Sequence, residues 1–193
     1  METVTKKTQG VISFDDTGSM SSARHEVRRR IKDLSKELFN TIPNLELGII
    51  IHNDYCDKDL IQSLPFSSDQ STIESFVNRS SSQGGGDHKE AYAYVLNHIR
   101  SMDWTADSKF TIMIGDAPPH EKGERSAGHT ELYDWREESR QLGNSGIPIY
   151  AIQALHNRSS NFLYEGMAQL SKGIKLDLSQ FSHITDYILA IAH

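Results

Sequence analysis

The sequence is poor in the features that mark secreted and membrane proteins. Its 193 residues include one cysteine, Cys56, so no disulfide can form within the chain. Every apolar run is far shorter than the roughly 20 residues that a membrane-spanning helix needs. Residues 1–10 lack the apolar stretch of a signal peptide. These absences exclude a disulfide-stapled scaffold, and we expect a cytoplasmic protein with no membrane partner.

Basic charge is also scarce. The chain has 20 lysines and arginines against 26 aspartates and glutamates, a net charge of −6. Proteins that grip the phosphates of nucleic acids usually carry a basic surface, so we expect no nucleic-acid partner. The one basic run, Arg28 to Arg30, lies beside apolar residues at helical spacing. This spacing favours a solvated helix face over a docking patch.

What the sequence does contain is a regular alternation of strand-like and helix-like segments. Apolar runs of strand length cover residues 10–14, 45–52, 109–115, 147–155 and 173–178. Helical periodicity covers residues 21–40, 69–80, 89–102, 130–142, 161–170 and 181–192. Residues 59–66 follow a strand after a short turn, which predicts an antiparallel edge strand. The pattern predicts one α/β domain over residues 1–193: a doubly wound, mostly parallel central sheet with one antiparallel edge strand and helices on both faces.

Oxygen-bearing side chains gather where the predicted strands end. Asp15 follows the first strand and Asp116 follows the strand at 109–115, so both acids should lie at the carboxyl edge of the sheet. Thr17 and Ser19 alternate with Asp16 along the next loop. A tight turn can therefore point Asp15, Thr17 and Ser19 inward, while Asp16 faces solvent or a partner.

A third loop adds another carboxylate, Asp87, after three glycines at the start of a predicted helix. Carboxylates and hydroxyls together form a set of hard oxygen ligands, which favours Mg²⁺, with Ca²⁺ or Mn²⁺ as alternatives. Zinc would normally use cysteine or histidine. Taken singly, each residue also fits a local role: a turn acid, a loop hydroxyl or, for Asp87, a helix N-cap.

Three segments in order, "FDDTGSM" (14–20), "GGGDHKEA" (84–91) and "IMIGDAPPH" (112–120), resemble the von Willebrand factor A (vWA) domain of intracellular and prokaryotic type. The resemblance extends over essentially the whole chain. It implies a metal-ion-dependent adhesion site in which Asp15, Thr17 and Ser19 form the first loop and Asp116 the third. Asp87 stands where the second loop usually has threonine, and this extra carboxylate should hold the cation more firmly while weakening its pull on an acidic ligand.

The function that the resemblance implies is protein binding, in adhesion or as a scaffold, without catalysis. Members of the family inside cells often act with AAA+ ATPases or in multi-protein complexes. Asp16, His88 and His120 are candidate partner contacts around the site, although either histidine also fits an ordinary surface position. Trp135 is either a partner anchor or a helix residue that covers the sheet.

Two other functions remain as alternatives. A metal-dependent hydrolase would also place carboxylates and Mg²⁺ at strand ends. The loops look superficially like those of haloacid dehalogenases, but Thr17 and His120 stand where that class needs acids. The third alternative is a structural subunit with a vestigial site.

Overall fold

A six-stranded sheet forms the centre of the computed structural model, which describes residues 6–79 and 88–192. The strand order is β3-β2-β1-β4-β7-β8, and β2 and β3 form the antiparallel pair while the other neighbours are parallel. The strands are β1 (Thr8–Asp15), β2 (Leu45–His52), β3 (Ile61–Ser67), β4 (Ser108–Gly115), β7 (Ile149–Gln153) and β8 (Ile174–Asp177).

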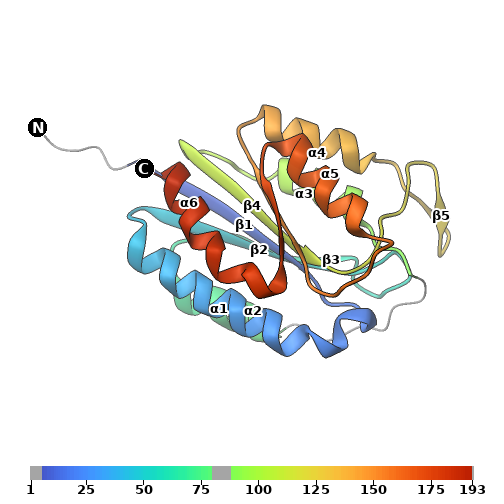
Figure 1. Cartoon of the computed structure of the whole chain (residues 1–193), viewed down its shortest axis with the longest axis horizontal. Coiled ribbons are helices and arrows are strands. Elements are labelled where there is room, and N and C mark those ends of the chain that lie inside the picture. Colours follow the sequence, from blue (N-terminus) through green and yellow to red (C-terminus); the bar gives the residue numbers. More distant parts are fainter. Residues whose placement is uncertain (1–5, 80–87, 193) are drawn as a thin grey trace, which may run out of the picture.

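Helices cover both faces of this sheet (Figure 1). One face packs against α1 (Arg24–Thr41), α2 (Gln70–Arg79) and α6 (Ile184–Ala192). The other packs against α3 (Tyr92–Arg100), α4 (Trp135–Asn144) and α5 (Asn161–Ser171). Short 3₁₀ turns at Gly18–Ser22 and Leu178–His183 precede α1 and α6. The predicted fold class is therefore confirmed.

Burial on both faces explains the continuous apolar runs of the central strands. Every residue of β1 is buried, and its side chains alternate between the two cores: Ile12 and Phe14 face α1, whereas Val11 faces α3. Such strands appear in a sequence as unbroken apolar segments. The polar residues at their ends consequently mark the edges of the sheet.

Several predicted boundaries need correction. The helix expected at residues 130–142 begins only at Trp135, because the preceding segment forms a small hairpin of β5 (Arg125–Ser126) and β6 (His129–Thr130). The helix expected from residue 89 begins at Tyr92, because Glu90 pairs with Pro119 in an isolated parallel bridge. Within the described part of the chain, no helix is long and apolar enough to cross a membrane.

Candidate metal site at the C-terminal edge of the sheet

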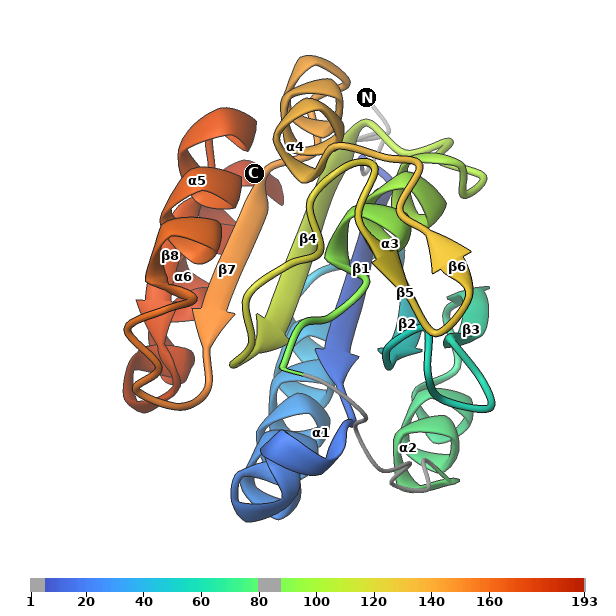
Figure 2. The ribbon, with the colours of Figure 1, turned by 90° about the vertical axis from the view of Figure 1, so that its right-hand side faces the viewer.

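Two neighbouring parallel strands bring the first pair of predicted ligands together. In the register of β1 and β4, Phe14 lies beside Ile114. Asp15 comes one residue after Phe14 and Asp116 two residues after Ile114, so both acids lie at the same edge of the sheet. Figure 2 shows the arrowheads of β1, β4 and β7 pointing to this edge. The topology thus places the loops after β1 and β4 next to each other, as the sequence predicts.

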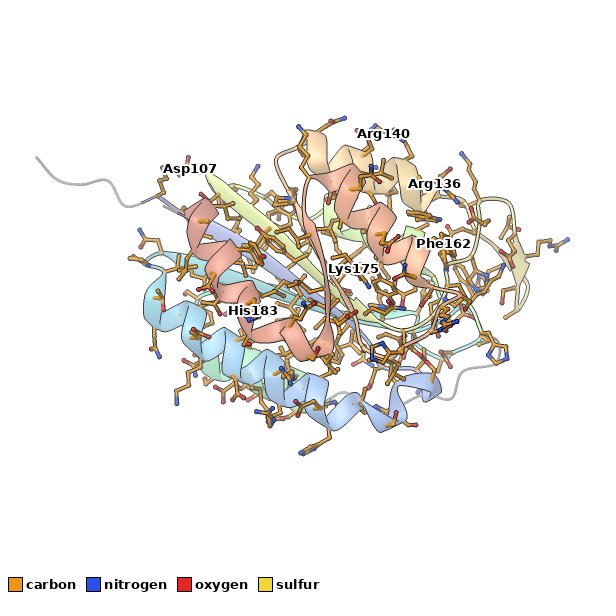
Figure 3. All side chains as sticks on the ribbon, in the orientation of Figure 1. Asp107, Arg136, Arg140, Phe162, Lys175 and His183 are labelled. Carbon is orange, nitrogen blue, oxygen red and sulfur yellow. The ribbon has the colours of Figure 1, made fainter. Side chains whose placement is uncertain are left out.

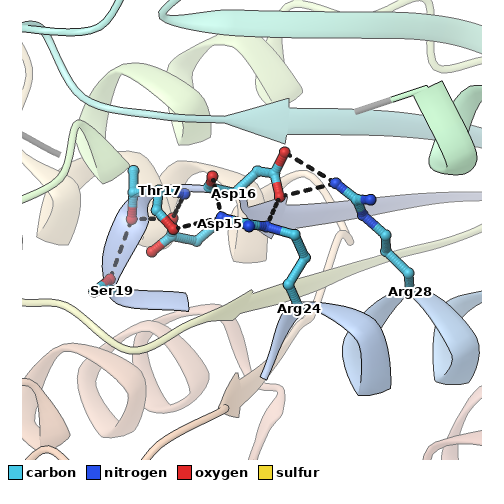
Figure 4. Close-up of polar contacts among 6 residues, drawn as sticks. All are labelled: Asp15, Asp16, Thr17, Ser19, Arg24 and Arg28. Atoms are coloured by element: carbon cyan, nitrogen blue, oxygen red, sulfur yellow. Dashed lines mark hydrogen bonds and ion pairs between the residues drawn. The ribbon is translucent and has the colours of Figure 1, made fainter. Parts of the chain in front are cut away.

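A chain of hydrogen bonds connects four of the predicted ligands. Asp15 Oδ1 accepts hydrogen bonds from the backbone amide of Thr17 (2.8 Å) and from its hydroxyl (2.7 Å). The Thr17 hydroxyl lies 3.1 Å from the Ser19 hydroxyl, and Ser19 in turn donates to Asp116 Oδ1 at 2.8 Å. Figure 4 shows the hydrogen bonds among Asp15, Thr17 and Ser19 of the first loop. The fifth predicted ligand, Asp87, lies outside the described residues.

The second oxygen of Asp15 is the least satisfied atom of the site. Asp15 is 1% exposed, and its Oδ2 has no hydrogen-bond partner among the described residues. Burial, with smaller contributions from the charges of Asp116 and Asp16, raises the pKa of Asp15 to about 7. A buried carboxylate with an unpaired oxygen requires either a proton or a cation. The residues present therefore fit a hard divalent cation.

Sequence reasoning missed a further acid beside these residues, Glu90. Its backbone is bonded to the loop after β4, accepting from the amide of His120 (3.1 Å) and donating to Pro118 O (3.0 Å). The side chain is 3% exposed, and Oε2 lacks a hydrogen-bond partner among the described residues. Burial and the charges of Asp15 and Asp54 raise the pKa of Glu90 well above its usual range. The available signal was an acid directly before the apolar start of α3.

A cavity of about 340 Å³ opens beside these acids, and its wall includes Ser19, His88, Glu90 and Asp116. Among the described residues, no three Asp, Glu, His or Cys side chains converge closely enough to hold an ion by themselves. A cation at this edge would therefore depend on the hydroxyls of the first loop and on water as well as on carboxylates. Mg²⁺ usually binds to proteins in this way.

The orientation predicted for Asp16 is wrong. Its side chain is 1% exposed and forms ion pairs with Arg24 Nε (2.7 Å) and Arg28 Nη2 (3.2 Å) of α1. Arg24 also donates to the Asp16 and Thr17 carbonyls. Arg28 of the basic run therefore pairs with Asp16 and keeps only 21% of its side chain exposed. Asp16 anchors the loop and is no longer a candidate partner contact.

The prediction of His120 as a partner contact is also wrong, because the side chain is buried. It is 2% exposed, and its Nε2 lies 2.7 Å from Asp54 Oδ1 beneath the surface of the edge. His88 is exposed and lines the cavity, so its position suits a partner contact. Trp135 is 3% exposed and packs against Phe162 of α5, as expected for a residue that covers the sheet.

No protein-family model matches the chain. The chain is 26% identical over 179 residues to the putative ariadne-like RING finger protein R811 of Acanthamoeba polyphaga mimivirus. This match covers 86% of the chain but 18% of that protein, so the chain spans less than a fifth of this relative's length.

Solved structures show the fold more clearly. BatB from Bacteroides thetaiotaomicron has a TM-score of 0.67 and 18% identity, covering 96% of this chain and 98% of that one. The pilus adhesin SpaC from Lactobacillus rhamnosus GG has a TM-score of 0.73 and 16% identity, covering 98% and 30%. The proximal thread matrix protein 1 from the mussel byssus has a TM-score of 0.65 and 16% identity, covering 97% and 48%. These neighbours define a vWA-type fold.

Proposed function

We propose that the protein is a binding module that holds a divalent cation, Mg²⁺ in the first instance, at the C-terminal edge of its sheet. The supporting observation is the buried Asp15 carboxylate, whose Oδ2 has no hydrogen-bond partner in the described part of the chain although Thr17, Ser19 and Asp116 form a connected set of oxygens beside it. Asp15, Thr17, Ser19 and Asp116 would hold the cation. Ca²⁺ and Mn²⁺ suit the same oxygens.

The cation would recognise an acidic side chain of a protein partner. Mg²⁺ keeps open or water-filled positions when few carboxylates hold it. At this site those positions would face the cavity beside Ser19 and Asp116. The named functions of the structural neighbours, a pilus adhesin and a thread matrix protein, support binding to proteins rather than catalysis.

We extend this proposal to the kind of protein partner and to its cellular location. A cytoplasmic AAA+ ATPase or another subunit of a multi-protein complex is the partner we propose. The mimivirus relative shows that a similar segment occurs within a much longer RING finger protein. We propose the same role, recognition of a protein partner, for this sequence within a longer protein.

Thermal unfolding tests whether the cation binds. We expect millimolar Mg²⁺ to raise the melting temperature relative to EDTA, because a ligand that binds only the folded state stabilises it. Asp116→Asn should abolish this increase, whereas Asp33→Asn on the exposed face of α1 should retain it. Equal melting temperatures of the unsubstituted protein in Mg²⁺, Mn²⁺, Ca²⁺ and EDTA would contradict the proposal. Hydrolysis of a generic phosphoester that is lost on Asp15→Ala would contradict a purely binding role.

Asp87 has its own test because the sequence departs from the family there. If its carboxylate adds to the cation's ligands, Asp87→Thr should weaken Mg²⁺ binding and strengthen binding of an acidic ligand. Isothermal titration calorimetry measures the first effect directly. Unchanged affinity for both the cation and the ligand would remove Asp87 from the site.

A further inference from the structure

A second polar cavity adjoins the candidate metal site along the same edge. It has a volume of about 390 Å³ and lies where β7 and β8 end and α5 begins. We name it the basic cavity. The residues that line it are Gln153, His156, Asn157, Arg158, Asn161, Lys175 and Asp177. Asn157 also lines the cavity that contains Ser19 and Asp116. One residue thus separates the two cavities.

The basic cavity has an excess of positive groups. Arg158 is exposed, and no carboxylate of the described residues forms an ion pair with its guanidinium. Lys175 contributes a second cation, which pairs with Asp177 at 3.2 Å, and exposed His156 contributes an imidazole. Among the described residues that line this cavity, Asp177 is the one acid. In a chain with a net charge of −6, this concentration of basic groups marks a place where an anion can bind.

The loop that presents Arg158 is held firmly against the metal site. Gln153 Nε2 donates to Asn157 O (2.7 Å) and to Ser160 Oγ (3.0 Å). Ser160 is fully buried, and its hydroxyl donates to the backbone carbonyl of Asp116 at 2.7 Å. The loop is therefore tied to the residue that would hold the cation. This connection places the loop that carries Arg158 next to the backbone of Asp116.

The start of α5 adds to the positive potential. Its N-cap residue is Ser160, and no side chain caps the helix because the serine hydroxyl bonds elsewhere. The N-terminus of a helix carries a partial positive charge that favours anions. Asn161, the first residue of α5, lines the basic cavity, as does Lys175 of β8, which Figure 3 labels.

We propose that the basic cavity is a second subsite for the protein partner, which presents two acidic side chains. One carboxylate would complete the shell of the cation, and the other would bind Arg158 and Lys175. This inference rests on the proposed function and specifies its partner: a segment with two acids spaced to reach both cavities. An acidic protein segment fits better than nucleic acid because the described residues that line the basic cavity offer only Arg158 and Lys175 as charged basic groups, and Lys175 pairs with Asp177, which suits a single carboxylate rather than a row of phosphates.

Synthetic peptides test the second subsite. The probes are fluorescein-labelled peptides with two glutamates separated by one to four glycines, and matched peptides in which one glutamate is glutamine. Fluorescence polarisation with excess Mg²⁺ measures binding to the unsubstituted protein, to Arg158→Gln and to a control, Arg140→Gln, which changes an exposed arginine of α4. We expect the best diacidic peptide to bind about 10-fold more tightly than its monoacidic match, as one charge-assisted contact predicts.

The variants separate the subsite from the cation site. Arg158→Gln should remove the advantage of the second glutamate and leave monoacidic binding unchanged, whereas Arg140→Gln should retain the advantage. An equal affinity for diacidic and monoacidic peptides at every spacing, or an advantage that persists in Arg158→Gln, would overturn the subsite. Tighter binding of a short oligothymidylate than of any diacidic peptide would also overturn it. Binding of all peptides that is indifferent to EDTA and to Asp116→Asn would instead overturn the proposed function.

Discussion

At the scale of single residues, two adjacent carboxylates after β1 have opposite surroundings. Asp16 is neutralised by Arg24 and Arg28, whereas Asp15 accepts hydrogen bonds at one oxygen and, within residues 6–79 and 88–192, has no partner at the other. Both are buried. Asp16 holds the loop in place by its ion pairs with α1, and Asp15 is the carboxylate that we propose binds a cation.

Asp15→Asn should stabilise the cation-free protein. The amide retains an acceptor for Thr17 and removes a buried charge, so we expect the free energy of unfolding in EDTA to rise by on the order of 2 kcal/mol at pH 8. The same variant should lose the stabilisation by Mg²⁺. Urea unfolding in EDTA and in Mg²⁺ measures both effects. A variant that is less stable than the unsubstituted protein in EDTA would show that the Asp15 charge is already satisfied.

Asp16→Asn should have the opposite effect on stability. It leaves Arg24 and Arg28 without their carboxylate, and breaking a largely buried pair typically costs several kcal/mol, so we expect a loss of about 2–4 kcal/mol. Asp33→Asn is the matched control, because its pair with Arg29 is exposed and such pairs contribute less than about 1 kcal/mol. Equal unfolding free energies for the two variants would contradict an anchoring role for Asp16.

At the scale of elements, the end of β4 is shaped by two buried tyrosines. A side-chain Cβ at Gly115 would lie 2.2 Å from the Tyr92 hydroxyl and 2.8 Å from that of Tyr164. These hydroxyls are 2.7 Å apart and come from α3 and α5. Gly115 therefore lets both helices approach the strand immediately before Asp116.

Gly115→Ala should lower stability by about 1–3 kcal/mol, because overpacking forces the tyrosines apart. The loss should be smaller in a Tyr92→Phe background, since the nearest clashing atom is then absent. A double-mutant cycle by urea unfolding measures this coupling. Additive effects would mean that the strand, rather than Tyr92, adjusts to the new methyl group.

The elements differ in how far the sequence predicts them. The run 45–52 matches β2 at both ends, because a strand buried on both faces is apolar throughout. The β5–β6 hairpin was missed because its strands have two residues each and carry no apolar alternation. The predicted ligands Asp15, Thr17, Ser19 and Asp116 do come together, since parallel strands end at one edge. Burial of Asp16 was not predictable, because it depends on a contact with Arg24 of α1 that no local pattern reports.

At the scale of the whole molecule, the buried acids at the sheet edge should make the free energy of unfolding depend on pH and on divalent cations. In the cation-free fold, the pKa of Asp15 is raised to about 7 and that of Glu90 is also raised. Between the ordinary carboxyl pKa near 4 and these raised values, the folded state holds protons that the unfolded chain has released. These two groups therefore destabilise the cation-free protein increasingly as pH rises through this range.

The expected result is a contrast between two pH profiles. From about pH 5 to about pH 8, the unfolding free energy in EDTA of the unsubstituted protein should fall relative to Asp15→Asn, because only the former must ionise this buried carboxyl. The stabilisation by Mg²⁺ should grow over the same range, since the cation replaces the proton. Parallel profiles for the two proteins would contradict the raised pKa. Stabilisation by Mg²⁺ that is independent of pH would show that no proton is displaced.

The central claim is that a divalent cation binds between the loops that follow β1 and β4. Crystals grown with Mn²⁺ test it most directly, because anomalous scattering identifies the ion without assuming its position. We predict an anomalous peak within coordination distance of the side-chain oxygens of Asp15, Ser19 and Asp116. The peak should be lost in Asp116→Asn. An absence of anomalous density at this edge would contradict the claim, whether Mn²⁺ is bound elsewhere in the crystal or not at all.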